Sequence, residues 1–261
     1  MTYAHALVLG LVQGLTEFLP VSSSGHLILV PHVFGWPDQG LAVDAALHLG
    51  TLAALVAYFR GELTDLVTGA LSRRLILVLL LATVPAAALG AALGGAIETG
   101  LRAPLRIAAT TAFWGGVMWA ADRRPARAVA SPGDPLGRVA WGQGLLIGCA
   151  QAVALIPGTS RSGITITTGL FTGLDRATAA RFAFLLGIPV TAGAGVVKSL
   201  EILQHGVPAG DGGPLLVAIL SSFVSGWFAV WFLVRYLKQR SLLPFVLYRL
   251  ALSATILLFA L

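Results

Sequence analysis

The sequence has 261 residues, of which 57% are hydrophobic and only 11% are charged, with a formal net charge of +6. A soluble domain carries roughly 25% charged residues, so this chain has too few polar side chains to cover a water-exposed surface. Its basic residues lie in short loops between apolar runs, which is typical of cytoplasmic loops of a membrane protein and argues against a nucleic-acid-binding surface.

Long apolar runs predict an all-α protein that crosses a membrane several times. A hydrocarbon core of ~30 Å needs about 20 apolar residues in a helix. The clearest runs of that length are Leu75–Ile97, Leu215–Val234 and Leu242–Leu261. Together with the shorter apolar runs and the basic loops, they predict a single polytopic membrane domain with about six full transmembrane helices.

The two halves of the chain resemble each other when the sequence is shifted by 138 positions. Gln13 then aligns with Gln151, and Gly25 aligns with Gly163. Each copy consists of an apolar run, a serine-rich break that contains a proline, and a second apolar run. The sequence therefore predicts an internal repeat.

The predicted repeats occupy about 1–121 and about 139–261, and the Arg-rich segment 122–138 links them as a cytoplasmic loop. The basic residues that flank each copy favour two re-entrant helical hairpins that enter the membrane from opposite faces. This is an inverted-topology repeat, a design in which sites form near the bilayer midplane where broken helices meet.

The first break carries polar residues that are unusual inside apolar sequence. Gln13 and Glu17 are four residues apart and share one helix face. Pro20 ends that helix, and the run Ser22, Ser23, Ser24 leads into a second helix near Gly25, where hydroxyls and free backbone N–H groups form an anion site. His26 lies in the first turn. An ionisable residue within a span is functional by default, although Glu17 as a structural carboxylate and His26 as a core histidine are the alternatives.

The second break contains Arg161, flanked by Ser160 and Ser162 and followed by Thr165. A guanidinium at bilayer depth costs ~2.5–3.5 kcal/mol even by lenient scales, which favours an anionic ligand, and its planar fork suits bidentate contacts to phosphate. The alternative is that Arg161 pairs only with Glu17 to hold the two hairpins together.

Several other polar residues are interpreted as packing or supporting groups. They are Asp44, His48 and Gln151, the last being the counterpart of Gln13 in the second repeat. The single cysteine, Cys149, excludes an intrachain disulfide and is expected to be a small buried hydrophobe.

At these two motifs the chain resembles the undecaprenyl-diphosphate phosphatase family, also known as the bacitracin-resistance proteins. The matching elements are Gln13 with Glu17, the stretch Ser22–His26, and Pro157–Thr165. The resemblance implies hydrolysis of undecaprenyl diphosphate to the monophosphate carrier of peptidoglycan and cell-wall synthesis, a divalent cation (Mg or Ca), and bacitracin resistance on overproduction. It also implies a bacterial cytoplasmic (inner) membrane protein whose site opens to the extracytoplasmic side.

These expectations give roles to individual residues. Ser23 is the expected nucleophile, His26 its base and later the acid, and Arg161 the clamp on the diphosphate. Glu17 either orients His26 or holds the divalent ion together with Gln13. The residues expected to bind substrate are Ser22, Ser24, Gly25, Ser160, Ser162 and Thr165.

Alternatives remain open at this point. His26 itself could be phosphorylated, or water could attack directly. A transporter or flippase for a polyprenyl phosphate lipid would use the same hairpin design, and a structural membrane subunit is a third class. The lipid diphosphate is the expected partner, and homodimerisation is left open.

Overall fold

The apolar runs form helices throughout a computed structural model, which describes all residues except 38–39, 101–102, 127–133, 206–209 and 261. The described residues contain α-helices and one 3-10 turn but no strand. The predicted all-α class is confirmed. The helices are α1 (Tyr3–Phe18), α2 (Ser23–Phe34), α3 (Gly40–Tyr58), α4 (Arg60–Thr68), α5 (Arg73–Gly100), α6 (Pro104–Asp122), α7 (Trp141–Val153), α8 (Arg161–Phe171), α9 (Arg176–His205), α10 (Gly212–Tyr236) and α11 (Leu243–Ala260), with the 3-10 turn η1 at Pro135–Arg138.

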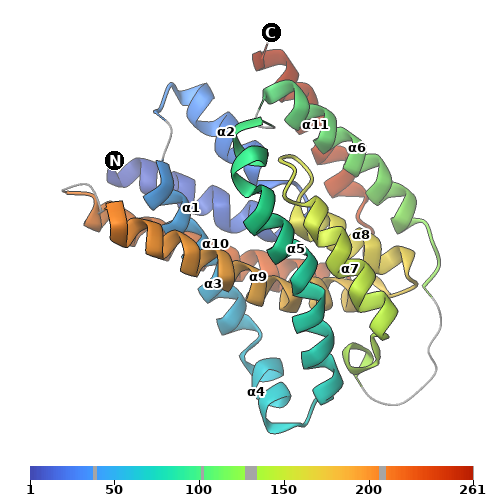
Figure 1. The fold of residues 1–261 in the computed structure, drawn as a ribbon. Helices are drawn as coiled ribbons and strands as arrows, with labels where there is room; N and C mark the ends of the chain where they lie inside the picture. Colours follow the sequence, from blue (N-terminus) through green and yellow to red (C-terminus); the bar gives the residue numbers. More distant parts are fainter. Residues whose placement is uncertain (38–39, 101–102, 127–133, 206–209, 261) are drawn as a thin grey trace.

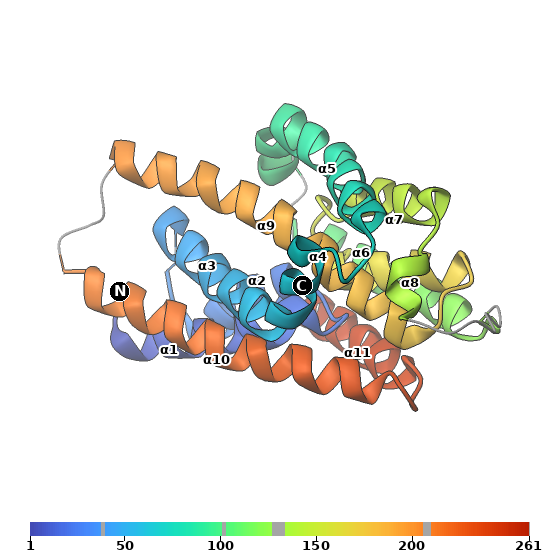
Figure 2. The same cartoon turned by 90° about the horizontal axis from the view of Figure 1, so that it is seen from below.

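The two halves of the chain repeat the same order of helices. Helices α7, α8, α9, α10 and α11 follow α1, α2, α3, α5 and α6 at the offset of 138 residues. Helices of one half pack against helices of the other half: α1 lies along α10, and α5 lies along α7 (Figures 1 and 2). Helix α6 packs against its own counterpart, α11. Each half therefore supplies a helix that the other half needs for burial.

Three helices of the described residues are long and apolar enough to cross a membrane. They lie at Arg73–Leu93, Arg176–Val197 and Gly212–Tyr236, and a fourth span arises if α3 and α4, which bend by 64° at Phe59, count as one. Many large apolar side chains on these helices face outward, as they do where lipid replaces water. The chain is a multi-pass membrane protein, and the number of about six full spans stays a prediction.

Both predicted breaks are present, and both use a serine in an unusual backbone conformation. Helix α1 ends before Pro20 and α2 begins after Ser22, whose φ is 77°. Helix α7 ends before Pro157 and α8 begins after Ser160, whose φ is 69°. A positive φ is uncommon for residues other than glycine. Residues with such strained backbone angles cluster at functional sites. The break geometry is thus the same in both halves.

Cys149 differs from its expected burial, and the expected link between the repeats lies partly outside the described residues. Cys149 is exposed on the surface of α7 and is not buried as expected, because this helix turns its apolar outer face toward the position of lipid. The proposed cytoplasmic link at 122–138 includes 127–133, which lie outside the described residues.

A cluster of charged side chains, Arg181, Asp134 and Glu62, joins α9 and α4 to the end of this link. Arg181 of α9 donates to Asp134 Oδ1 at 2.9 Å and to Oδ2 at 2.8 Å, and also reaches Glu62 Oε1 of α4 at 3.3 Å. The hydrogen bond from the Arg181 guanidinium holds the pKa of the Asp134 carboxyl below its usual value. A lowered carboxyl pKa means that the pair stabilises the fold above the unfolded-state pKa and loses this effect as the pH falls through the folded-state pKa.

We expect Asp134→Asn to lower the melting temperature in detergent by about 1–3 °C at pH 7, because a partly exposed pair contributes little. The difference from the wild type should shrink in ~1 M salt and vanish in acid. Intrinsic fluorescence during heating measures it, with Asp65→Asn at an exposed position of α4 as the control. Equal melting temperatures for Asp134→Asn and the wild type at pH 7 would contradict this prediction.

Candidate active site

The two serine-rich breaks meet in the interior and are joined by reciprocal hydrogen bonds. Ser24 Oγ of the first break accepts from the Gly158 N–H of the second at 3.1 Å. Ser162 Oγ, the counterpart of Ser24, donates to the Leu19 carbonyl of the first break at 3.2 Å. Equivalent serines thus fix the two breaks to each other, as expected from a repeat whose polar tips share one site.

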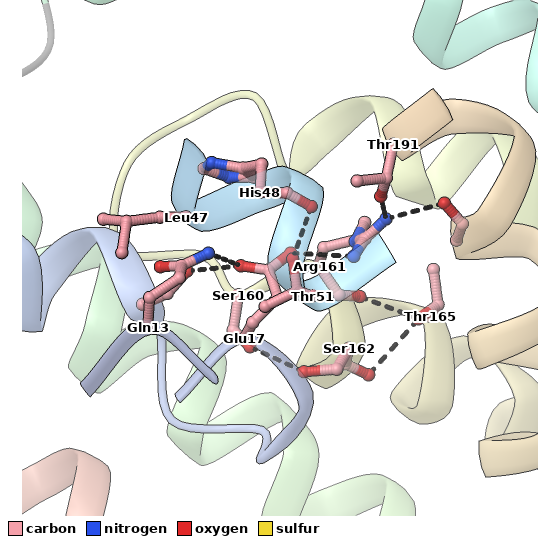
Figure 3. Close-up of polar contacts among 12 residues, drawn as sticks. Gln13, Glu17, Leu47, His48, Thr51, Ser160, Arg161, Ser162, Thr165 and Thr191 are labelled. Atoms are coloured by element: carbon pink, nitrogen blue, oxygen red, sulfur yellow. Dashed lines mark hydrogen bonds and ion pairs between the residues drawn. The ribbon is translucent and has the colours of Figure 1, made fainter. Parts of the chain in front are cut away.

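Glu17 is the centre of the polar contacts between the breaks (Figure 3). Its Oε2 accepts from Ser23 Oγ at 2.8 Å and from Gln13 Nε2 at 3.0 Å, and its Oε1 accepts from Arg161 Nη2 at 2.7 Å. The carboxylate is 9% exposed. A buried carboxylate is tolerated only when it is paired and hydrogen-bonded, and here all three of its partners are residues predicted for the site.

Arg161 is held from a second direction by α9. Its Nη1 donates to the Gly187 carbonyl at 3.1 Å and to Thr191 Oγ1 at 2.5 Å. A Cβ atom at Gly187 would lie only 3.0 Å from Nη1, so any larger residue there would push on the guanidinium. The fork therefore points one nitrogen at Glu17 and the other at α9, which fixes its plane.

These residues border a cavity of about 240 Å³ between the breaks, α3, α7 and α9. Its polar wall consists of Glu17, Ser22, Ser23, Ser24, His48, Gln151, Ser160, Arg161 and Thr191. Its apolar wall consists of Ala86, Ala154, Leu155, Val190 and Ala194. The cavity thus combines hydroxyls, a carboxylate and a guanidinium with apolar side chains.

Some predicted substrate-binding residues do not line this cavity. Thr165 Oγ1 donates to the Arg161 carbonyl at 2.7 Å, and Ser162 is used by the contact between the breaks. Gly25 borders a separate apolar groove between α2, α6 and α11. In this structure these three residues support the site, and their contact with substrate stays a prediction.

His26 has different partners from those expected. Its Nδ1 donates to the Ser22 carbonyl at 2.7 Å, which leaves Nε2 to accept from the Tyr248 hydroxyl at 2.6 Å. The two rings stack with centroids 5.6 Å apart. The group in contact with the Ser23 hydroxyl is the Glu17 carboxylate and not the His26 imidazole that was expected there.

Arg249 of α11 is a second buried guanidinium, only 1% exposed. It donates to Thr111 O at 3.0 Å, to Gly158 O at 2.9 Å and to Thr159 O at 3.1 Å, with a longer contact of 3.4 Å to Pro20 O. Since Pro20 belongs to the first break and Gly158 to the second, Arg249 joins the backbones of both.

We expect Arg249→Met to lower the free energy of unfolding by about 2 kcal/mol or more, because it leaves several buried carbonyl oxygens without a donor. Activity should fall less at low temperature than near the melting point. Arg235→Met, at an exposed position of α10, is the control. Chemical denaturation in detergent measures the difference, and an Arg249→Met protein as stable as the control would show that the four carbonyls do not need this donor.

Comparison with known proteins places this site in a family. The family model for the bacitracin resistance protein BacA matches residues 6–255. The chain belongs to the BacA family. Similar relatives are the undecaprenyl-diphosphatases of Pelobacter propionicus (45% identical, covering 96% of this chain and 94% of the relative), Alcanivorax borkumensis (45%, 98% of each) and Geobacter metallireducens (46%, 99% and 98%).

The match to the BacA family includes both breaks and Arg249, so the whole candidate site lies within it. Sequence reasoning missed Thr191, Tyr248 and Arg249, and interpreted His48 and Gln151 as packing groups although both border the cavity. Arg249 carried a signal, since it interrupts the apolar run of α11. The roles of Thr191 and Tyr248 depend on how distant helices pack, and no local pattern marks them.

The expected metal ligands, Gln13 and Glu17, are neighbours that both carry side-chain oxygens, although the amide nitrogen of Gln13 is the atom that faces Glu17. Gln13 Oε1 is buried without a hydrogen-bond partner in the described structure, and the Glu17 carboxylate lies beside it through Gln13 Nε2. Mg²⁺ takes oxygen ligands and is often bound by only one or two protein groups together with water and substrate phosphates. Among the described residues no group of three His, Cys, Asp or Glu side chains could hold an ion, so any ion here would need such additional ligands.

Proposed function

We propose that this chain hydrolyses undecaprenyl diphosphate to undecaprenyl phosphate and inorganic phosphate, which returns the lipid carrier to peptidoglycan synthesis. The observation that carries this proposal is the meeting of Glu17, Ser23 and Arg161, from two separate breaks, at one cavity among apolar helices. The relatives named undecaprenyl-diphosphatase, at about 45% identity over nearly the whole chain, support the same activity.

The charges of the site favour an anionic ligand. Two guanidinium groups lie at the breaks, Arg161 partly buried and Arg249 buried, and the buried Glu17 carboxylate pairs with Arg161 alone. A diphosphate that enters the cavity replaces Glu17 as the partner of Arg161 Nη2. It also receives hydrogen bonds from the hydroxyls of the breaks. The released carboxylate oxygen then has one donor fewer, which makes Glu17 a better proton acceptor.

The chemistry that follows uses Ser23 as the nucleophile. Its Oγ forms a bond to the terminal phosphorus while the bond from that phosphorus to the bridging oxygen breaks, and the hydroxyl proton passes to Glu17. Glu17 passes this proton to the bridging oxygen of the lipid monophosphate, which leaves, so the Glu17 carboxylate is free again. Water then attacks the phosphoserine, gives a proton to Glu17, and releases inorganic phosphate, after which Ser23 recovers its proton from Glu17. Arg161 neutralises the charge that develops on the phosphoryl oxygens.

Two further groups complete the proposal. Gln13 and Glu17 would hold a divalent cation (Mg or Ca), which supplies additional positive charge for the diphosphate. His26, fixed by Ser22 and Tyr248, orients the first turn of α2 and thereby the Ser23 hydroxyl. A catalytic role for His26 as acid or base requires its ring to turn from these partners.

The internal repeat supports an inverted topology. Counterpart helices exchange places between the halves, and Ser24 and its counterpart Ser162 each bond to the backbone of the opposite break, which supports a pseudo-twofold relation. With the axis of this relation in the membrane plane, the breaks lie near the midplane. We place the protein in the bacterial cytoplasmic membrane with the cavity open to the extracytoplasmic side, as the family resemblance implies.

A phosphate-release assay on detergent-solubilised protein tests the function. With farnesyl diphosphate or undecaprenyl diphosphate and Mg²⁺ or Ca²⁺, we expect release of one phosphate per lipid and the monophosphate as the only lipid product. Chelation of divalent ions should abolish the release. If the purified protein releases no phosphate but moves a polyprenyl phosphate across liposomes, the protein is a transporter and the proposed function is wrong.

A further inference from the structure

Gln151 of α7 is a buried side chain with no partner at either end of its amide. It is 2% exposed, it borders the cavity beside Ser160 and Arg161, and neither Oε1 nor Nε2 has a hydrogen bond in the described structure. Leaving both polar atoms of a buried amide unpaired is costly. A glutamine at such a position indicates a ligand that completes its hydrogen bonds.

Its counterpart Gln13 shows why this amide is unpaired. Gln13 Nε2 donates to Glu17, four residues further along α1. The residue four positions after Gln151 is Leu155, an apolar residue of the cavity wall. The second repeat thus keeps the glutamine but lacks its carboxylate partner, so the amide of this cavity-lining residue is left unpaired.

The position of Gln151 in the cavity suggests which group it meets. Glu17, Ser23 and Arg161 surround the point where the terminal phosphorus is attacked. Gln151 comes from α7, and the residues that follow this helix, Ala154 and Leu155, are apolar and border the same cavity, which suits the start of the apolar lipid tail. The amide Nε2 donates hydrogen bonds, and phosphate oxygens accept them.

We propose that Gln151 binds the phosphate that stays on the lipid, by donating from Nε2 to its non-bridging oxygens. This inference rests on the proposed function, because it assumes a lipid diphosphate in the cavity. A neutral amide adds affinity for the second phosphate without adding a charge that would hold the monophosphate product. Gln151 is then a residue that selects diphosphates over compounds with a single phosphate.

Replacing Gln151 with Met, which has a similar length and no amide, tests the proposal. We expect KM for farnesyl diphosphate to rise about 10-fold while kcat changes less than about 2-fold, since uniform binding is lost. Inhibition by inorganic phosphate, which needs only the Arg161 end of the cavity, should change less than about 2-fold. The melting temperature should stay equal or rise, because an unpaired buried amide is removed.

Gln143, on the same helix, provides a matched control with a structural role. Its side chain donates to the Thr172 carbonyl at 3.1 Å and accepts from the Ala140 N–H at 2.9 Å. Gln143→Met should lower the melting temperature and leave KM unchanged. If Gln151→Met behaves in the same way, Gln151 is a structural residue and the inference is overturned.

Binding of a farnesyl methylenediphosphonate, which cannot be hydrolysed at the bridge, separates this inference from the proposed function. We expect its Kd to be about 10-fold higher for Gln151→Met than for the wild type in a calorimetric titration. Equal Kd values overturn the role of Gln151, even if the wild type hydrolyses the natural substrate. Weaker binding by the variant, together with no hydrolysis by the wild type, supports the role of Gln151 in recognition and refutes only the phosphatase activity.

Discussion

Replacing Arg161 with Ala is expected to lower kcat/KM for a polyprenyl diphosphate about 10³-fold or more. An arginine that neutralises charge on a transferring phosphoryl group accelerates such reactions by about 10³–10⁵. Arg161→Lys should recover only a small part of this loss, because Lys lacks the planar fork that reaches Glu17 and α9 at once. Phosphate release at saturating and at low substrate concentration measures the two kinetic constants.

Arg161→Ala should also destabilise the protein, so a control has to separate lost stability from lost activity. Removing one partner of a buried ion pair costs about 3–5 kcal/mol, whereas replacing both partners is often neutral. We therefore expect the double variant Glu17→Gln with Arg161→Met to melt close to the wild type and still show no activity. A double variant that is both stable and active would show that the ion pair only holds the breaks together.

Replacing Ser23 with Ala is expected to lower kcat by about 10⁴-fold or more, because removal of an enzyme nucleophile has an effect of up to ~10⁶. Stability should change by only about 1 kcal/mol, since one hydrogen bond to Glu17 is lost. Ser22→Ala and Ser24→Ala are the matched controls in the same break, and their activities should fall far less.

Trapping of the phosphoenzyme identifies the nucleophile directly. After rapid quenching of the reaction with a substrate labelled in its terminal phosphate, the label should be on Ser23 and should be absent in Ser23→Ala. Label on His26 in an active Ser23→Ala protein would refute the serine mechanism. An active Ser23→Ala protein without any label would indicate direct attack by water.

Several features of the site could be predicted from local sequence. Both breaks were predicted because Pro and Ser interrupt apolar runs at equivalent places, and the 138-residue repeat implied that the breaks meet. The pairing of Glu17 with Arg161 was only the alternative to an anionic ligand for Arg161, and the structure contains this ion pair. Local composition determines these features, and the structure bears them out in the contacts of Glu17.

Side-chain directions could not be predicted in the same way. His26 follows Ser22 by one helical turn, and the positive φ of Ser22 aims its carbonyl at the His26 ring. The ring therefore turns toward Tyr248, 222 residues away in sequence, and not toward Ser23. The spacing of apolar and polar residues in the sequence does not predict the backbone angle of a single residue. It also does not predict a contact between residues this far apart in the chain.

The exchange of helices between the halves has a consequence for biosynthesis. Because α1 packs along α10 and Glu17 pairs with Arg161, 144 residues later, the N-terminal half enters the bilayer before its partners have been translated. During this interval the first break carries an unneutralised carboxylate within the nascent chain. The inserted N-terminal half is then a partly assembled intermediate with exposed packing surfaces. If the two halves are expressed from separate genes, we therefore expect each half to accumulate in the membrane only when the other is made at the same time.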